Sequence, residues 1–125
     1  ICQQLIPSIR MSAGVITFIG QNGVQELRAA PRWAAYNAAK ASLIVLARTI
    51  AQSEGQNGVR CNVVNPGIID TGHYSSEFLA RIAEQIGLKR VGTPGEIANC
   101  VQWLHSEKAS YVSGAVIDLS GGYVP

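Results

Sequence analysis

The segment VRCNVVNPG, Val59–Gly67, decides the fold class of this chain. Its valine-rich run predicts a strand buried on both faces, and the Pro-Gly pair predicts a turn at its end, because proline cannot donate to a strand ladder. Similar segments lie on either side of it in the sequence. They are GVITFIG, Gly14–Gly20, and GAVIDLSGG, Gly114–Gly122, and both are short apolar runs bounded by glycine, as expected of buried strands.

Helices are predicted around these strands, at residues 1–10, 31–52, 75–86 and 93–105. The second follows Pro31 and has no internal glycine or proline, and the fourth opens with Thr93 and Glu96 at capping-box spacing. Strands that alternate with helices indicate right-handed crossovers and a parallel sheet covered on both faces. We therefore expect an α/β fold, organised as a single domain over residues 1–125.

The amino-acid composition of the chain argues against several classes of function. Ten basic and eight acidic residues are scattered without runs of like charge, so neither nucleic acid nor a membrane surface is an expected partner. The three cysteines are far apart and outside any zinc-binding spacing, which predicts no disulfide framework and no metal site. No apolar stretch approaches the roughly 20 residues of a membrane span, and no secretion signal opens the sequence. A cytoplasmic protein is expected.

Tyr36 and Lys40 lie four residues apart in the second predicted helix, in the segment YNAAK. Residues at this spacing share a helix face, so the phenol and the ammonium can point to the same place. A nearby cation stabilises a phenolate relative to a phenol, which makes the hydroxyl a usable proton donor or acceptor. The alternative is that the two side chains only share a solvated face.

Ligands of parallel α/β sheets collect beyond the carboxyl ends of the strands. In this chain those ends are predicted at residues 20–23, 65–71 and 120–122. The helix that carries Tyr36 begins after the loop that follows the first of them. We therefore expect the functional site at this edge of the sheet.

Four segments resemble the short-chain dehydrogenase/reductase family, in the family's order. They are YNAAK after the VITFIG strand, VRCNVVNPGIIDT, RVGTPGEIA and SYVSGAVIDLSGG. The resemblance covers nearly the whole chain and implies the last three strands of a Rossmann-like parallel sheet, with their helices. The family's amino-terminal dinucleotide-binding half, with its glycine-rich turn, would precede residue 1 and is expected to be missing from this chain.

The resemblance implies catalytic roles for the tyrosine and the lysine. Tyr36 would exchange a proton with a substrate hydroxyl or carbonyl during hydride transfer. Lys40 would assist it and hydrogen-bond the nicotinamide ribose of the cofactor, NAD or NADP. Both residues would therefore contact the cofactor as well as support the reaction.

The resemblance also implies a cofactor-binding segment after the second strand. Pro66 and Gly67 would form the wall beside the nicotinamide ring, where a glycine lets the main chain approach a ligand closely. The main chain of Ile69 would meet the carboxamide, and Thr71 would add a side-chain hydrogen bond. Asn62 is expected to brace the backbone near this turn rather than to touch a ligand.

One departure from the family concerns the catalytic serine. The family places it after the strand that precedes the tyrosine, whereas this chain reads Gly20, Gln21, Asn22 and Gly23. The side-chain amide of Gln21 or Asn22 could donate a hydrogen bond to the substrate oxygen in place of the missing hydroxyl. We assign Gln21 as the third catalytic residue.

The resemblance implies an NAD(P)-dependent oxidoreductase that interconverts a hydroxyl and a carbonyl on a small-molecule substrate. The chain would be its carboxyl-terminal part and is expected to be inactive in isolation. The alternative is a truncated, non-catalytic relative that acts as a self-associating scaffold or partner-binding module. Because the strand at residues 14–20 would lack a neighbour and expose an apolar edge, we expect a homo-oligomer or a complementing amino-terminal portion. The substrate and the choice between NAD and NADP stay open.

Overall fold

The computed structural model describes residues 2–124. Helices and strands follow one another in the expected order: α1 (Cys2–Met11), β1 (Val15–Ile19), α2 (Ala34–Glu54), β2 (Arg60–Pro66), α3 (Ser76–Ala83), α4 (Pro94–Leu104) and β3 (Val116–Leu119). Short 3-10 helices lie in the connections: η1 (Val24–Glu26), η2 (Gly55–Asn57) and η3 (Glu107–Ala109). The predicted start of the first helix at Ile1 lies outside the described residues.

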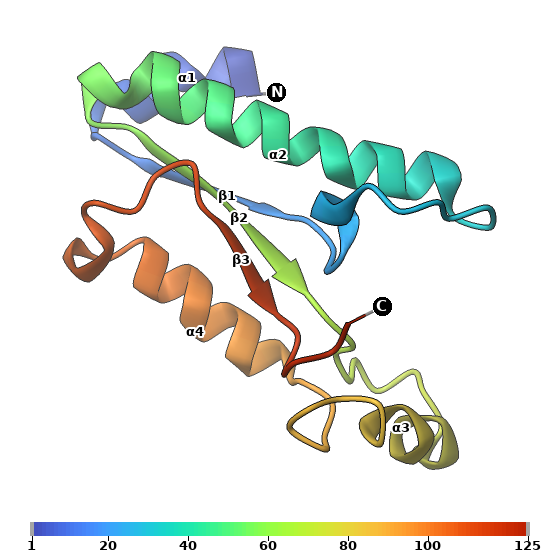
Figure 1. Ribbon diagram of the computed structural model, residues 1–125. Coiled ribbons are helices and arrows are strands. Elements are labelled where there is room, and N and C mark those ends of the chain that lie inside the picture. The colour runs from blue at the N-terminus through green and yellow to red at the C-terminus, as the bar shows by residue number, and fades with distance from the viewer. Residues whose placement is uncertain (1, 125) are drawn as a thin grey trace.

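The three strands form one parallel sheet in the order β1-β2-β3 (Figure 1). The central strand β2 pairs with β1 from Arg60 and with β3 from Val63, so it is bonded on both sides. The predicted α/β fold with a partial Rossmann-like parallel sheet is therefore confirmed. Within the described residues β1 pairs only with β2 and lies at an edge of the sheet, as expected.

Some boundaries differ from the sequence-based expectations, for conformational reasons. The long helix begins at Ala34 rather than at Pro31, because the chain first makes a turn and Trp33, at φ −130°, is not helical. The last strand is shorter than the predicted segment, because Gly114 and Gly121 have positive φ angles of 76° and 63°, which are incompatible with an extended strand. The predicted polar loop after β1 contains the short helix η1.

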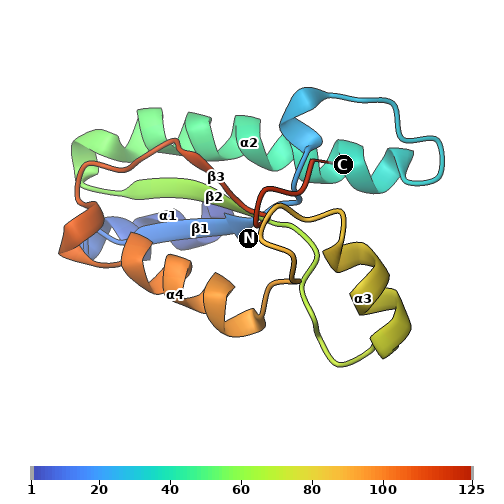
Figure 2. The ribbon, with the colours of Figure 1, turned by 60° about the horizontal axis from the view of Figure 1, so that its bottom comes forward.

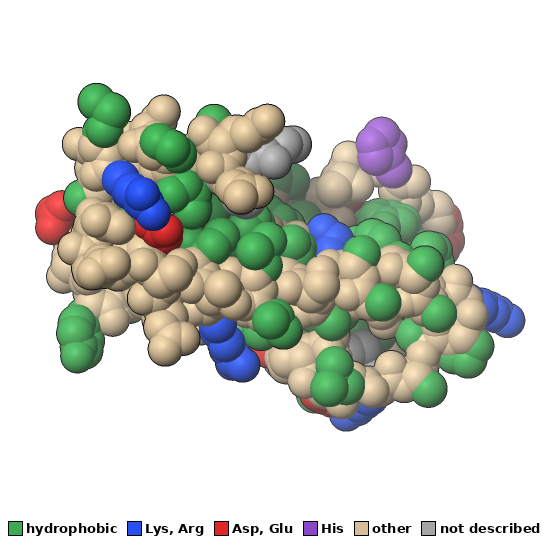
Figure 3. All heavy atoms as spheres, turned by 90° about the horizontal axis from the view of Figure 1, so that it is seen from above, with side chains coloured by type: hydrophobic (Ala, Val, Ile, Leu, Met, Phe, Trp, Pro, Cys, Tyr) green, Lys and Arg blue, Asp and Glu red, His purple; other side chains and the backbone are tan. Residues whose placement is uncertain are grey.

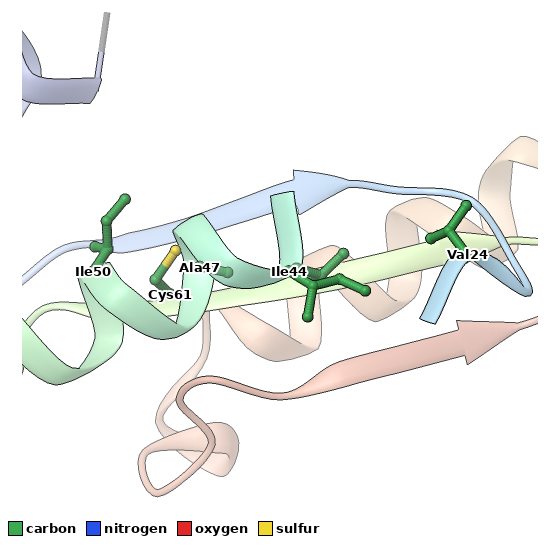
Figure 4. Packing of buried hydrophobic residues seen from close by; sticks show 6 residues of the cluster. Val24, Ile44, Ala47, Ile50 and Cys61 are labelled. Atoms are coloured by element: carbon green, nitrogen blue, oxygen red, sulfur yellow. The ribbon is translucent and has the colours of Figure 1, made fainter. Parts of the chain in front are cut away.

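Helices cover both faces of the sheet, as Figures 1 and 2 show. On one face α2 packs against β2 through a core cluster that includes Ile44, Ala47, Cys61 and Val63 (Figure 4). On the other face α4 packs against β2 and β3, and Leu104 is completely buried there. The alternation of side chains along β2 thus supplies two cores, one for each layer of helices.

The first helix lies beside α2 and is joined to its end by an ion pair. Both nitrogens of the Arg10 fork, Nε and Nη2, donate to the Glu54 carboxylate, at 2.6 and 2.8 Å. Figure 3 looks down on this side of the molecule, and hydrophobic side chains are visible at the surface along and between the helices. Leu5 on α1 is 50% exposed, and Val45 on α2 is 68% exposed. This face is therefore incompletely covered.

The predicted capping box at the start of α4 is confirmed. Thr93 Oγ1 accepts from the Glu96 main-chain N–H, and the Glu96 carboxylate accepts from the Thr93 N–H in return. The Arg90 guanidinium also donates to Glu96 with two nitrogens. These hydrogen bonds, first those from Arg90 and then that from Thr93, lower the pKa of Glu96 from 4.5 to about 2.

In the described part of the chain, no helix combines the length and the apolar character that crossing a bilayer requires.

Truncation of Leu104 tests the packing of α4. Leu104→Ala should lower the free energy of unfolding by about 2–5 kcal/mol, because it opens a cavity beneath the sheet. Leu46→Ala is the matched control, since Leu46 is 40% exposed, and it should cost less than about 1 kcal/mol. Urea unfolding measures both values, and equal losses would contradict the described core.

The lowered pKa of Glu96 makes stability depend on acid pH. A carboxylate with a depressed folded-state pKa stabilises the fold fully above its unfolded pKa of 4.5 and loses this effect as the pH falls toward about 2. The stability difference between the wild type and Glu96→Gln should therefore shrink between pH 4.5 and 2, measured by urea unfolding at each pH. Glu107→Gln serves as a control without a described ion pair, and an equally pH-dependent difference there would contradict the assignment.

Candidate active site

The carboxyl ends of the strands meet at one edge of the sheet and enclose a hollow of about 410 Å³. We call it the strand-end hollow. It is lined by the end of β1 and the loop after it, by the start of α2, by the turn after β2 and by the carboxyl-terminal segment. The lining residues are Ile19, Gly20, Gln21, Asn22, Tyr36, Lys40, Pro66, Gly67, Ile68 and Tyr123.

Tyr36 and Lys40 reach this hollow from neighbouring turns of α2. Lys40 Nζ donates to the main-chain oxygen of Ile19 at 2.8 Å and lies 5.6 Å from the centroid of the Tyr36 ring. Tyr36 is 48% exposed, and the edge of its ring meets Trp33. A half-exposed phenol thus stands beside a cation whose position is fixed by the last residue of β1.

The loop after β1 brings Gln21 and Asn22 to the hollow in different ways. Within the described residues no hydrogen bond engages the side chain of Gln21. Asn22 is nearly buried, and its Nδ2 donates to the main-chain oxygen of Tyr123 at 2.8 Å. Of the two amides considered from the sequence, Asn22 is therefore committed to the chain itself, and Gln21 is the available donor.

The segment after β2 reaches the hollow with only part of its expected residues. Pro66 and Gly67 line it, and Gly67 donates its N–H to Leu119 on β3 at 2.9 Å. Ile69 lines a separate hollow of about 190 Å³, and Thr71 is exposed beyond the strand-end hollow.

The main chain of Ile69 is available for a ligand. Ile69 forms an isolated parallel bridge with Gly92, in which Ile68 O and Asp70 N–H make the two hydrogen bonds to Gly92. In such a bridge the N–H and C=O of the central residue point away from its partner. Within the described residues these two groups of Ile69 have no partner, as a ligand-binding main chain requires.

Two residues of the hollow, Ile19 and Tyr123, lie just outside the strand ends predicted from the sequence. Tyr123 follows the glycine pair at the end of the last strand, and its position beyond a parallel strand end is the signal that could have identified it. Asn62 braces the backbone as expected, but it does so at the segment leading into β3. Its Nδ2 donates to Val112 O and its Oδ1 accepts from Ala115 N–H.

The side chains of α3 contribute nothing to the strand-end hollow. Phe78 stacks on Tyr74 with ring centroids 5.0 Å apart, and the Arg81 guanidinium lies over its ring. Figure 1 shows α3 beyond the carboxyl ends of the strands, as a separate short helix. His105, just after α4, lies with its Nε2 3.2 Å from Thr17 Oγ1 on β1.

Comparison with known proteins establishes the family. The model of a family described as enoyl-(acyl carrier protein) reductase matches residues 1–124. The chain belongs to the short-chain dehydrogenase/reductase family. A relative within this family is 3-oxoacyl-[acyl-carrier-protein] reductase MabA of Mycobacterium bovis, which is 49% identical over 90 residues, 70% of this chain and 36% of MabA.

Two solved short-chain dehydrogenase/reductase structures resemble the whole chain. L-sorbose reductase from Gluconobacter frateurii, complexed with NADPH and L-sorbose, has a TM-score of 0.84 and 27% identity, covering 98% of this chain and 52% of that one. A 3-oxoacyl-[acyl-carrier protein] reductase from Brucella melitensis with bound NAD has a TM-score of 0.82 and 27% identity, covering 98% and 45%. The chain spans about a third to a half of the length of these proteins.

Proposed function

We propose that this chain supplies the proton-transfer site of an NAD(P)-dependent oxidoreductase that interconverts a hydroxyl and a carbonyl on a small molecule. One observation carries the proposal: Tyr36, Lys40 and Gln21 line a single hollow at the carboxyl edge of a parallel sheet. Membership of an oxidoreductase family supports it. The other half of the active site would come from chain that precedes this segment in relatives that are longer than this chain.

Each of the three side chains has a role that follows from its position. Tyr36 exchanges a proton with the substrate oxygen, since its half-exposed hydroxyl can meet a substrate. Lys40, held by Ile19 O, places a positive charge beside the phenol. Gln21 donates its side-chain N–H to the same substrate oxygen, as the family's serine hydroxyl does.

The residues present fit a nicotinamide cofactor. When bound, its nicotinamide supplies or accepts the hydride. Pro66 and Gly67 would form the wall beside it, and the unpartnered main-chain groups of Ile69 suit a carboxamide, which both donates and accepts. The exposed hydroxyl of Thr71 would add a hydrogen bond. Solved relatives contain NADPH or NAD, so either form is a candidate.

Association is part of the proposal. Within the described residues the outer edge of β1 pairs with no other strand, and Ile19 at its end is 43% exposed. Such an edge pairs readily with another strand. We infer that the 125-residue chain associates, with a second copy or with a complementing amino-terminal portion, and that it is inactive alone. The alternative of a non-catalytic, self-associating scaffold rests on the same edge and predicts that no NAD(H) binds.

Removal of the Tyr36 hydroxyl tests the catalytic assignment. In the intact enzyme, Tyr36→Phe should lower kcat by about 100-fold or more, because the proton has no donor, while the circular dichroism spectrum stays unchanged. Tyr111→Phe is the control, since Tyr111 is fully exposed and lies outside the strand-end hollow. Turnover by Tyr36→Phe close to that of the wild type would refute the assignment.

A charge at the β1 edge tests association. Native mass spectrometry of the chain should show species above the monomer mass of 13.3 kDa, and Ile19→Lys should weaken them by placing a charge beside the pairing edge. Leu88→Lys introduces the same charge at a position that is 64% exposed and whose N–H donates to Gly121 O, after β3 at the opposite edge of the sheet from β1, and it should have no effect. A soluble wild-type monomer at micromolar concentration would rule out pairing of two copies.

A further inference from the structure

Hydrogen bonds hold the loop that carries Gln21 on both sides of this residue. Gly20 donates its main-chain N–H to Val64 O at 2.8 Å, and Asn22 donates its own to Pro66 O at 3.1 Å. The side chain of Asn22 also donates to Tyr123 O. The Cα position of Gln21 is therefore set by hydrogen bonds of its two neighbours to β2 and to the carboxyl-terminal segment.

A second set of hydrogen bonds holds the loop four residues beyond Gln21. Asn65 Nδ2, on β2, donates to Gln25 Oε1 and to Asp118 Oδ1, both at 3.0 Å. Gln25 Nε2 in turn donates to Asp118 Oδ2. Three side chains from η1, β2 and β3 thus form a closed ring of hydrogen bonds, which we call the Asn65 clip. Asn65 itself is completely buried.

The clip holds the Asn65 amide in one orientation at a cost. Asn65 Oδ1 is buried and has no hydrogen-bond partner among the described residues, which is unfavourable for a carbonyl oxygen. Turning the amide over would present its NH₂ group to Gly20 and would take both donors away from Gln25 and Asp118. The two acceptors on the other side therefore determine how the amide lies.

Asn65 Oδ1, the oxygen without a partner, occupies the space that a side chain at position 20 would need. A Cβ atom on Gly20 would lie 2.0 Å from Asn65 Oδ1 and 3.0 Å from Val63 Cγ1, well inside contact distance. The φ angle of Gly20 is not positive, so the backbone itself would accept other residues. Glycine is required at this position because Asn65 fills the space, and any larger residue would have to break the clip.

We propose that Asn65 and Gln25 are positioning residues: through the clip they fix the loop after β1 so that the Gln21 amide stays in the strand-end hollow beside Tyr36. This inference rests on the proposed function for the role of Gln21. Neither residue is among those that line the hollow. Gly20 is the point at which the clip and the loop touch.

Hydrogen exchange of the chain tests the clip directly. Gln25→Met keeps the length of the side chain and removes two hydrogen bonds, so exchange of the Asn22 main-chain N–H should become about tenfold faster or more. Exchange at Val63 on β2, whose N–H donates to Ala115 O on the side of β3, should change much less. Gln52→Met, on the exposed side of α2, is the matched control and should alter neither.

Two exchange results would overturn the proposal. One is unchanged exchange at Asn22 in Gln25→Met. The other is an acceleration at Asn22 that equals the one at Val63, because the clip would then support the whole fold and not the loop.

A double-mutant cycle tests the contact between Gly20 and Asn65. Gly20→Ala should raise the equilibrium constant of unfolding roughly tenfold or more in the wild type, and less than about threefold in an Asn65→Ala background, where the amide is gone. Gly55→Ala is the control, since a Cβ there meets nothing within 4 Å, and its effect should be the same in both backgrounds. Equal effects of Gly20→Ala in the two backgrounds would refute the contact.

A kinetic measurement separates a positioning role from a merely structural one. In the intact enzyme, Gln25→Met should lower kcat several-fold with an unchanged KM for the nicotinamide cofactor, because the cofactor segment after β2 is untouched. An unchanged kcat would overturn the positioning role. If the proposed function is wrong, Tyr36→Phe will retain its turnover. The hydrogen-exchange and unfolding results for the clip do not depend on that outcome.

Discussion

The hydrogen bonds that β2 makes to a strand on each side determine where every part of the site lies. They continue past the strand ends, since Gly20 N–H donates to Val64 O and Gly67 N–H donates to Leu119 O. These hydrogen bonds hold three segments together at one edge of the sheet: the loop after β1, the turn after β2 and the segment after β3. Loops at a parallel strand edge are otherwise free to diverge, and here the ladder itself sets their distances.

Helix α2 is attached to the end of the sheet by a residue of the candidate active site. Lys40 reaches Ile19 O from α2, so one side chain joins the helix to the end of β1 and carries the charge beside Tyr36. Core packing of Ile44 and Ala47 holds the same helix further along. Because the helical spacing fixes Tyr36 relative to Lys40, the strand end, the cation and the phenol form one connected unit.

Much of this arrangement could be predicted from the sequence, because its signals are local. The valine run and the Pro-Gly stop identified β2, and the spacing of Thr93 and Glu96 identified the start of α4. The parallel order then placed the strand ends together. The boundaries that were wrong depend on backbone angles at single residues such as Gly114 and Gly121, for which the sequence offers no unambiguous signal. The Asn65 clip was beyond reach, because it joins residues 40 and 53 positions apart and depends on the strand register.

The contact between Gly20 and Asn65 also has an evolutionary consequence. A lineage that gains a side chain at position 20 while it keeps Asn65 passes through a protein in which two atoms compete for one place. Change at position 65 has to come first, and only then does position 20 become free to vary. The order of substitutions is thus constrained by geometry, and the glycine is maintained by its neighbour on the adjacent strand. Among relatives, the identities at these two positions should therefore vary together.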